Sequence, residues 1–449
     1  MHVAFWFDFS CPYAYLASRR VEEICAAAGA RLTLEPMLLG GVFRLTGAGD
    51  GPMASLPPPR ALHNARDMGR WADRLGVPFA VPAAHPMRTV RALRTLLGLP
   101  PARWPAAMHA LYAAYWQRGA DLTDDRVIGD ALAAAGLPAE LIDHARATAD
   151  DDARKDDLRR RTDRAVALGI FGAPAVVVDR GDGRPPVLLW GQDRLHWLEA
   201  VLAGWDPDAG APPRTPPADG QPPAPPLPAP PVVDAWFDYS SPFAYLGASR
   251  IGQVAAAAGA AVRWRPMLLG ALFRAFGTPD VPLFAMPAAK RAYVSRELDR
   301  WARWWGVPFR FPSRFPLRTV TPLRLTLLAG RDAPALIARV FAAAWSEDRD
   351  ISDPAVLRAL AADAGVDPTL VDRTGEPAVK QALVDATAAA ADAGVFGAPT
   401  WIVHAAGGPL LFWGQDRLDL VDAALRGWRP TREPADASAA VTAGAGGVA

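Results

Sequence analysis

The chain has 449 residues, a length that suggests two or three domains. Hydrophobic residues make up 51%, charged residues 21%, and the formal net charge is +1. This balance predicts globular domains, and nothing in it resembles the basic face or high pI typical of nucleic-acid binding. No apolar run of about 18 residues is free of charge, and no signal-peptide pattern opens the sequence. With only two cysteines in the chain, we expect no disulfide and a cytoplasmic setting.

The first part of the chain alternates between strand patterns and helix patterns. An apolar run rich in Phe and Trp predicts a strand, and Pro12 then begins a helix that should end near Gly29. A long stretch with helical spacing separates a second strand from a hairpin and a closing helix. The predicted elements cover residues 3–7, 12–29, 31–36, 55–168, 175–178, 187–190 and 192 onward.

The same order returns about 230 residues later, which indicates a domain duplication. Trp-Phe-Asp-Phe-Ser-Cys-Pro-Tyr-Ala-Tyr-Leu at residues 6–16 returns as Trp-Phe-Asp-Tyr-Ser-Ser-Pro-Phe-Ala-Tyr-Leu at residues 236–246. Two later motifs, Phe-Gly-Ala-Pro and Trp-Gly-Gln-Asp-Arg-Leu, also occur once in each copy. The second set of predicted elements covers residues 232–237, 242–259, 261–266, 285–393, 400–403, 410–413 and 415 onward.

This order predicts an α/β protein with two thioredoxin-like domains, each carrying a large helical insertion. We expect domain 1 over residues 1–205 and domain 2 over residues 232–428. Residues 206–231 are dense in proline and predict a semi-rigid linker. Residues 429–449, rich in Ala and Gly, predict a disordered tail.

The three repeated motifs resemble those of the 2-hydroxychromene-2-carboxylate isomerase family. That family belongs to the DsbA-like branch of thioredoxin folds and is close to the kappa-class glutathione transferases. The resemblance implies a glutathione-dependent isomerase that interconverts a hydroxychromene carboxylate and its ring-opened benzylidenepyruvate in aromatic-compound catabolism. The glutathione sulfur would add to the conjugated chain, allow bond rotation and leave. The implied partner is a small aromatic or conjugated keto acid, and the two halves would pair as an intramolecular pseudo-dimer.

The residue before the helix-starting proline differs between the copies. Ser241 is either a simple N-cap or, as the resemblance implies, a hydroxyl that faces the glutathione sulfur beside the helix-start amides. Cys11 replaces the family's serine, and a thiol at a helix start is expected to be acidic and reactive. Because Ala14 stands where a resolving cysteine would be, DsbA-type dithiol chemistry is disfavoured. Cys11 remains open between a redox site, a tolerated replacement and decay of one copy, and Cys25 is expected to be buried.

Two further motifs imply a glutathione site in each copy. The Ala-Pro pairs resemble the cis-proline turn of thioredoxin folds, or they simply begin a strand. The Gln-Asp pairs complement the dipole of the closing helix, or they bind the γ-glutamyl end of glutathione. The predicted glutathione-binding residues are Ala173, Pro174, Gln192, Asp193, Ala398, Pro399, Gln415 and Asp416.

The helical blocks of the two copies differ in their polar residues. The second copy has Lys290 and Tyr293 where the first has Arg60 and His63. Lys290 and Tyr293 are candidates for holding the substrate carboxylate or phenol, unless they belong to a solvated helix face. Arg274 is a third substrate candidate, although the family has Lys there, and Arg does not replace Lys neutrally. No His or Cys cluster predicts a metal site.

The hypothesis is therefore a tandem isomerase in which Ser241 stabilises the thiolate, grouped with Lys290, Tyr293, Ala398 and Asp416. One alternative is a thiol-disulfide oxidoreductase or kappa-like glutathione transferase that uses Cys11. Another is a pseudo-dimeric glutathione-binding protein with one or no active half.

Overall fold

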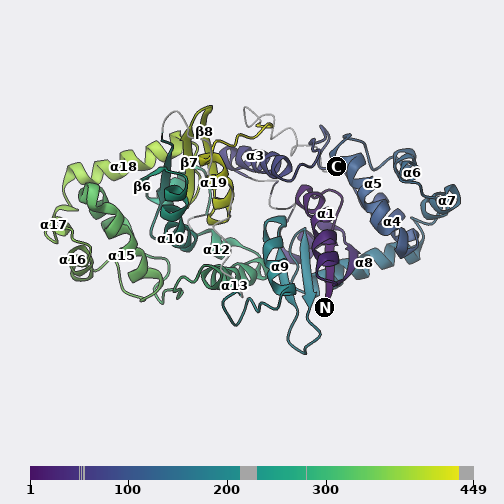
Figure 1. Ribbon diagram of the computed structural model, residues 1–449, viewed down its shortest axis with the longest axis horizontal. Helices are drawn as coiled ribbons and strands as arrows, with labels where there is room; N and C mark the ends of the chain where they lie inside the picture. The colour runs from purple at the N-terminus through teal and green to yellow at the C-terminus, as the bar shows by residue number, and fades with distance from the viewer. Residues whose placement is uncertain (50, 52, 54–55, 213–229, 280, 434–449) are drawn as a thin grey trace. The chain divides into compact units, whose positions relative to one another are not determined.

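The computed structural model describes all residues except 50, 52, 54–55, 213–229, 280 and 434–449. The chain forms two compact units, whose elements are labelled in Figure 1. Unit 1 contains Met1–Ala209, Met286–Tyr293 and Pro430–Ala449, and unit 2 contains Gly210–Ala285 and Val294–Arg429. Each unit therefore holds one copy of the repeated sheet, and unit 1 also includes short segments from the second half of the chain.

The sheet of unit 1 has the order β2-β1-β3-β4. Its central strand β1 runs parallel to β2 and antiparallel to β3, and β4 closes a hairpin with β3. Five of the six β1 residues are buried, which explains why β1 reads as an unbroken apolar run instead of an alternating pattern. The predicted strands of this copy are confirmed as His2–Phe7 (β1), Arg31–Pro36 (β2), Ala175–Asp179 (β3) and Val187–Trp190 (β4).

Helices fill the rest of unit 1, as the sequence predicts. Helix α1 follows β1 directly, with Pro12 as its first residue, and Gly29 beyond its end has a positive φ of 62°. The predicted helical block resolves into six α-helices, α3 to α8. The helices are Pro12–Ala27 (α1), Leu39–Thr46 (α2), Pro58–Arg74 (α3), Val90–Gly98 (α4), Trp104–Trp116 (α5), Asp125–Ala134 (α6), Ala139–Ala147 (α7), Asp152–Ala167 (α8) and Leu195–Leu202 (α9), with a 3₁₀ turn at Pro101–Arg103.

Unit 2 repeats this topology with the sheet order β6-β5-β7-β8 and the same parallel and antiparallel pairs. Its strands are Val232–Phe237 (β5), Ala261–Pro266 (β6), Thr400–Ala405 (β7) and Gly408–Trp413 (β8). The second-copy helices are Pro242–Ala257 (α10), Leu269–Ala275 (α11), Pro282–Ala285 (α12), Ala288–Trp305 (α13), Val320–Ala329 (α14), Ala333–Trp345 (α15), Pro354–Asp363 (α16), Leu370–Arg373 (α17), Pro377–Asp392 (α18) and Leu418–Leu425 (α19), with a 3₁₀ turn at Gly330–Asp332. The start of α13, residues 288–293, belongs to unit 1.

The closing helix of each copy starts later than the sequence predicts. Gln192–Arg194 and Gln415–Arg417 form 3₁₀ turns, and the α-helices begin at the following leucine. Before the second turn, Gly414 has φ 106° and ψ 150°, a conformation that is essentially restricted to glycine. A Cβ atom there would lie 2.4 Å from Asp416 Oδ1, so glycine also makes room for the aspartate side chain to fold back.

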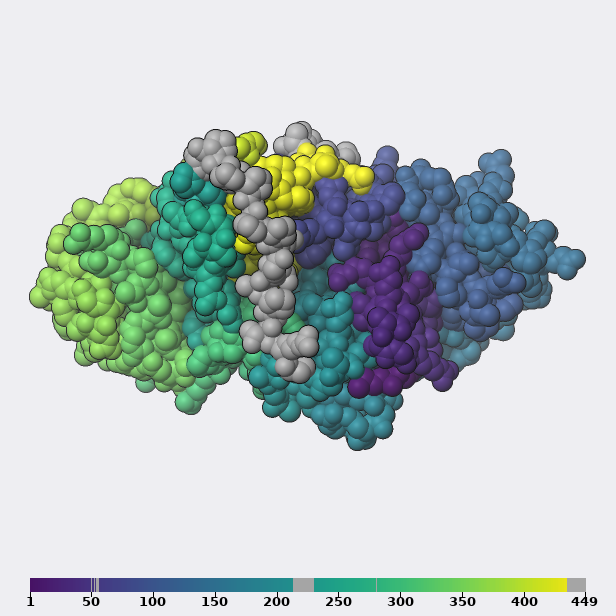
Figure 2. All heavy atoms as spheres, viewed as in Figure 1, coloured from purple at the N-terminus to yellow at the C-terminus, as the bar shows by residue number. Residues whose placement is uncertain are grey.

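Parts of the predicted linker and tail lie outside the described residues, namely 213–229 and 434–449. Within the range expected to be disordered, residues 431–433 belong to unit 1 and contact α3. Thr431 N donates to Asp73 Oδ2 at 2.6 Å, and Glu433 Oε1 lies 2.5 Å from Arg70 Nε. The yellow C-terminal segment therefore runs along dark-blue α3 (Figure 2). Neither cysteine forms a disulfide, and no helix within the described ranges is both long and apolar enough to cross a membrane.

Candidate functional site

A buried aspartate braces the strand–helix junction in each copy. Asp8 accepts hydrogen bonds from Ser10 N at 2.9 Å, Leu39 N at 2.8 Å and Thr89 Oγ1 at 2.6 Å. Asp238 accepts the equivalent bonds from Ser240 N and Leu269 N at 2.9 and 2.8 Å. Burial raises the pKa of both carboxyl groups, although these hydrogen bonds oppose the shift. The motif aspartates therefore hold the loop that presents Cys11 or Ser241.

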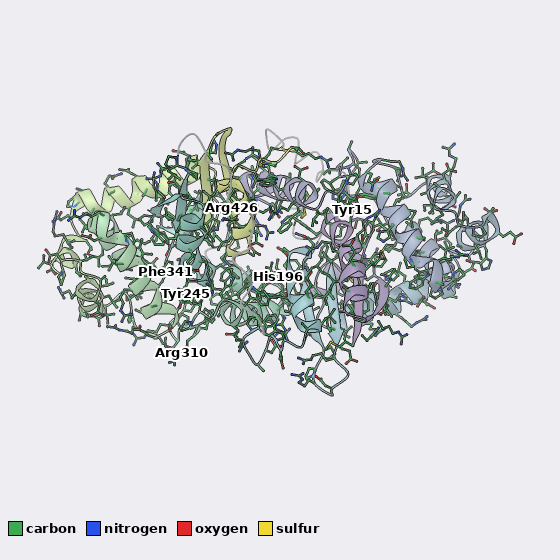
Figure 3. All side chains as sticks on the ribbon, in the orientation of Figure 1. Tyr15, His196, Tyr245, Arg310, Phe341 and Arg426 are labelled. Carbon is green, nitrogen blue, oxygen red and sulfur yellow. The ribbon has the colours of Figure 1, made fainter. Side chains whose placement is uncertain are left out.

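The motif tyrosine also has a structural role. Tyr15 OH donates to Pro78 O at 2.6 Å, and Tyr245 OH donates to Pro308 O at 2.5 Å. Figure 3 labels Tyr15 in unit 1, and Tyr245 with Phe341 in unit 2, where the last two ring centroids lie 6.0 Å apart. These bonds tie the first helix of each copy to the proline-rich break in its helical block.

Ser241 lies at the N-terminus of α10 with both hydrogen-bonding functions of its hydroxyl engaged. Its Oγ accepts a hydrogen bond from Ala244 N at 3.1 Å, which makes it a side-chain N-cap. The same hydroxyl donates to Ala398 O at 3.0 Å, immediately before the proline of the next motif. The structure therefore joins Ser241 to Ala398 and Pro399, as the grouping of these motifs predicts.

Cys11 occupies the equivalent place in unit 1 but has a different electrostatic character. Its Sγ lies 3.1 Å from Ala173 O, while the thiol makes no N-cap hydrogen bond. Burial raises the pKa of Cys11 from 9.0 to about 12, and the nearby Asp8 carboxylate adds to the shift. The first-turn amides of Tyr13 and Ala14 lower the pKa, but by less than burial raises it. The expectation of an acidic, reactive thiol at this helix start is therefore wrong.

This raised pKa predicts slow alkylation of Cys11. At pH 7 only about one thiol in 10⁵ would be ionised, and the rate with iodoacetamide should rise about tenfold per pH unit. Because the thiol pKa is higher in the folded chain than in the unfolded chain, the associated stability is present below pH 9 and declines between pH 9 and 12. Peptide mass spectrometry in a Cys25→Ser background measures the rate at Cys11. A rate that levels off below pH 8 would instead show an acidic thiol.

In each unit, the carbonyl group of the alanine before the motif proline contacts Cys11 or Ser241. Both Ala173-Pro174 and Ala398-Pro399 have cis peptide bonds, as the resemblance implies, and so do His85-Pro86 and Phe315-Pro316, which the sequence did not suggest. Two of the repeated motifs meet at this turn. A Cβ atom on Gly172 would lie 2.8 Å from Trp190 Nε1, and one on Gly397 would lie 2.6 Å from Trp413 Nε1. Glycine is thus required because the tryptophan of the later motif packs over the turn.

The Gln-Asp pair follows that tryptophan at the same edge of the sheet. Gly191 N donates to Pro174 O at 3.0 Å, so the backbone links this turn directly to the cis-proline turn. Gln192 is 1% exposed, yet neither its amide oxygen nor its amide nitrogen has a hydrogen-bond partner within the described residues. Asp193 forms an ion pair with Arg194 at 3.0 Å. A buried amide without partners is costly, and a polar ligand at this turn would satisfy it.

Unit 2 has the same arrangement. Gly414 N donates to Pro399 O at 3.0 Å, Gln415 is 3% exposed, and Asp416 Oδ1 lies 3.2 Å from Arg417 Nη1. The structure thus brings together, in each unit, the helix start, the cis-proline turn and the Gln-Asp turn. These parts fit glutathione in their chemistry: a helix N-terminus for a thiolate, a turn backbone for a peptide and a buried polar turn for the γ-glutamyl end.

The predicted substrate residues are divided between the units. Arg274 is exposed in the last turn of α11 in unit 2. Lys290 and Tyr293 belong to unit 1, where Lys290 Nζ lies 5.4 Å from the ring centroid of Trp190. Tyr293 is fully buried in the core of unit 1. The grouping of Lys290 and Tyr293 with Ser241 is therefore corrected, because both residues belong to unit 1 whereas Ser241 belongs to unit 2.

Sequence reasoning also missed one titratable residue beside the Gln-Asp turn. His196 follows Asp193 in unit 1 and is labelled in Figure 3. Burial, reinforced by the positive charge of Arg194, lowers the pKa of His196 to about 3, so its ring is neutral at ordinary pH. A lone histidine in an apolar helix gives no sequence signal of this shift, because burial is a tertiary property.

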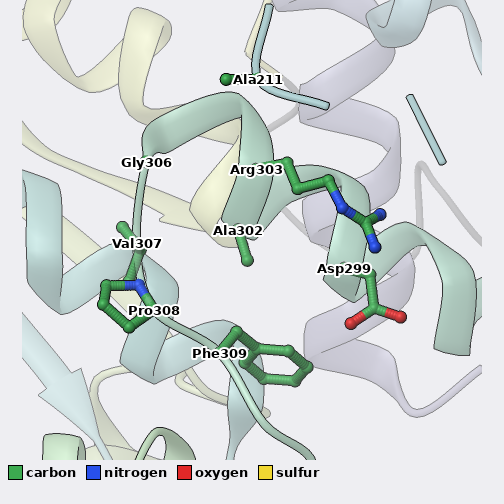
Figure 4. A pocket seen from close by; sticks show the side chains of 8 residues that line it. All are labelled: Ala211, Asp299, Ala302, Arg303, Gly306, Val307, Pro308 and Phe309. Atoms are coloured by element: carbon green, nitrogen blue, oxygen red, sulfur yellow. The ribbon is translucent and has the colours of Figure 1, made fainter. Parts of the chain in front are cut away.

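A separate cavity of about 280 Å³ lies in unit 2 beside the end of α13 (Figure 4). Asp299, Arg303 and Phe309 are among its lining residues, and none of the predicted site residues is. It adjoins the hydrogen bond that ties α10 to the helical block, because its lining residue Pro308 accepts that bond from Tyr245. Within the described ranges, no group of three His, Cys, Asp or Glu residues is placed to hold a metal ion.

Comparisons with known proteins identify the family that both halves of the chain match. The DSBA-like thioredoxin domain family matches residues 2–203 and 232–426. A 2-hydroxychromene-2-carboxylate isomerase of Pseudomonas putida is 30% identical over 209 residues, which cover 46% of this chain and 99% of that protein. Glutathione S-transferase kappa 1 of Rattus norvegicus is 26% identical over 207 residues, covering 43% and 90%. A solved 2-hydroxychromene-2-carboxylate isomerase structure is 26% identical, covers 43% and 94%, and has a TM-score of 0.38.

Both halves of the chain match the family separately, and in each half the strand–helix, cis-proline and Gln-Asp motifs of this chain lie together. The chain therefore belongs to the DSBA-like thioredoxin domain family, as a tandem duplicate related to the 2-hydroxychromene-2-carboxylate isomerases and the kappa-class glutathione transferases.

Proposed function

We propose that the protein is a glutathione-dependent isomerase of the 2-hydroxychromene-2-carboxylate isomerase type. The observation that carries this proposal is the position of the Ser241 hydroxyl, between Ala244 N and Ala398 O at the N-terminus of α10. A hydroxyl there can turn its hydrogen from the carbonyl toward a negatively charged sulfur. Relatives named as isomerases and kappa transferases support the reaction class.

When bound, glutathione would supply a thiol that adds reversibly to a conjugated chain and permits rotation about the attacked bond. The residues of this chain would bind and orient the reactants. The first-turn amides of α10 and the Ser241 hydroxyl favour the ionised sulfur. Asp416 would hold the γ-glutamyl ammonium, and Gln415 its carboxylate, beside the turn backbone of Ala398 and Pro399.

The substrate class that fits is a small aromatic or conjugated keto acid. Its carboxylate requires a cation, and the candidates are exposed Arg274 in unit 2 and half-buried Lys290 in unit 1. We propose that the reaction takes place in the cytoplasm. We also propose that the two halves act as an intramolecular pseudo-dimer, which is supported by the inclusion of residues 286–293 in unit 1.

The alternative chemistry through Cys11 has weaker support. A thiol whose pKa is raised to about 12 is almost entirely protonated at neutral pH and is a poor nucleophile. Both cysteines are buried and neither forms a disulfide, so Cys25 gives no support to a dithiol mechanism. A glutathione-binding protein with one active half is the remaining alternative. It is favoured because unit 1 has Cys11 where unit 2 has Ser241.

Isothermal titration of the full chain with glutathione tests the proposed cofactor. Gln192→Leu should weaken binding in unit 1 about tenfold, because a buried hydrogen bond to a charged group is lost. The same variant should melt at a higher temperature without glutathione, since leucine removes an unsatisfied buried amide. Gln381→Leu, at an exposed position on α18, is the matched control and should change neither value. If the wild-type chain shows no binding, the proposed function is wrong.

A further inference from the structure

The start of α13 lies in the second half of the sequence but belongs to unit 1. Residues 286–293 group with the first sheet, and Ala289 packs against the apolar cluster that contains Trp6 and Ala175. Tyr293 is a fully buried member of the same cluster. Its ring centroid lies 5.4 Å from that of Phe171 and 6.3 Å from that of Trp190. Tyr293 therefore packs against both motif aromatics of the first copy.

The hydroxyl of Tyr293 accepts a hydrogen bond at the edge of the unit 1 sheet. β4 is an edge strand, and its last residue, Trp190, pairs with Ala175. The next residue, Gly191, donates its N–H inward to Pro174 O, so the N–H of Trp190 points away from the sheet. A partly buried edge N–H needs an acceptor, and Tyr293 OH accepts it at 2.9 Å.

The hydrogen bond from Trp190 N to Tyr293 OH is linked to the candidate site by a short series of contacts. Trp190 is followed by the Gly191 bend and the buried Gln192 amide, and Gly191 is bonded to the cis-proline turn. The carbonyl before that proline faces Cys11 Sγ at 3.1 Å. Fixing the end of β4 therefore fixes the Gln-Asp turn relative to the helix start. Within the described residues, the acceptor for Trp190 N is Tyr293 OH.

We infer that Tyr293 is a positioning residue for the first site, so that the second half of the chain completes the ligand site of the first half. Its hydroxyl holds the strand end that carries Gln192 and Asp193. The ligand at this turn is the γ-glutamyl end of a glutathione-like peptide, and this part of the inference rests on the proposed function. The residue of the first copy at the duplicate position is His63, which lies on α3.

Hydrogen exchange of the full chain, followed by mass spectrometry, tests this with Tyr293→Phe. Peptides covering residues 187–194 and 410–417 report the two Gln-Asp turns separately. Without ligand, exchange in 187–194 should accelerate about tenfold, as expected for one lost hydrogen bond. With glutathione as the probe, the concentration that half-protects 187–194 should rise several-fold, while 410–417 should not change.

Tyr239→Phe is the matched control, because Tyr239 is also fully buried and its hydroxyl is bonded to Thr326 Oγ1 at 2.6 Å in unit 2. It should leave the 187–194 peptide unchanged. Unchanged exchange in 187–194 for Tyr293→Phe would overturn the inference, as would an equal change in both turns. If glutathione protects neither turn of the wild-type chain, the proposed cofactor is wrong, while the ligand-free exchange still decides the role of Tyr293.

Discussion

Ser241→Ala should lower glutathione-dependent isomerisation of 2-hydroxychromene-2-carboxylate about 100-fold, whereas Cys11→Ala should leave the rate nearly unchanged. The size follows from the loss of one preorganised donor to a developing negative charge. Ser241 Oγ is buried and is held by Ala244 N, so its hydrogen can point only to Ala398 O or to a ligand. Cys11 has the same position, but its high pKa and weak S–H donor make it a poor substitute.

The serine variant also removes an N-cap, which by itself costs about 1 kcal/mol of stability. Asp353→Ala separates the two effects. Asp353 caps α16 of the same unit by accepting from Ala355 N at 2.8 Å, and it is exposed. It should lower the melting temperature to a similar extent and leave kcat/KM intact. If Cys11→Ala abolishes the reaction and Ser241→Ala does not, the Cys11 alternative replaces the proposed function.

Glu433→Gln should destabilise the α3 region of unit 1 by about 3 kcal/mol, at the lower end of the range for a broken buried ion pair. The side chain of Arg70 is 0% exposed and its Nε lies 2.5 Å from Glu433 Oε1, while Glu433 itself is 24% exposed. In this variant, the buried guanidinium of Arg70 faces a neutral amide at position 433 instead of a carboxylate. Exchange of the α3 amides under denaturant measures the change locally, without assuming that the two units unfold together.

Two controls make this prediction specific. Glu347→Gln breaks a comparable Arg–Glu pair at 2.6 Å to Arg339, but both side chains are more exposed, at 38% and 27%. It should cost less than about 1 kcal/mol. Arg70→Met combined with Glu433→Gln should cost less than Glu433→Gln alone, because the double variant has no buried guanidinium facing the neutral amide. Equal effects of the Glu433 and Glu347 variants would contradict a buried pair.

The close approach of backbone atoms supports the same contact. A Cβ atom on Gly69 would lie 2.8 Å from Arg432 O, so a larger residue at position 69 would displace the C-terminal segment. Arg432 Nη1 also donates to Phe79 O at 2.7 Å, next to Pro78, which accepts from Tyr15. Composition alone predicted disorder for this stretch, since nothing in a Pro-Thr-Arg-Glu sequence reveals a partner more than 350 residues away.

The repeated motifs show which features of the fold can be predicted from local sequence. Each strand and the start of α1 follow from apolar runs, proline at a first helical position and glycine beyond a helix end. The cis-proline turns follow from resemblance, and the structure agrees with it. The closing helices were predicted three residues early, because Gln192–Arg194 and Gln415–Arg417 have helix-like sequences but form 3₁₀ turns held by the preceding glycine.

By itself, the sequence determined the fold, the duplication and the residues that meet at each helix start, because these features follow from local sequence patterns and from the order of the motifs. Only the tertiary structure decided which side chains serve which copy and how they ionise. Tyr293 bonds to a strand 103 residues earlier, and Cys11 becomes a weak acid because the surrounding core excludes water. Contacts between residues far apart in the sequence, and the burial of a side chain from solvent, depend on the whole fold. A local sequence pattern predicts neither of them.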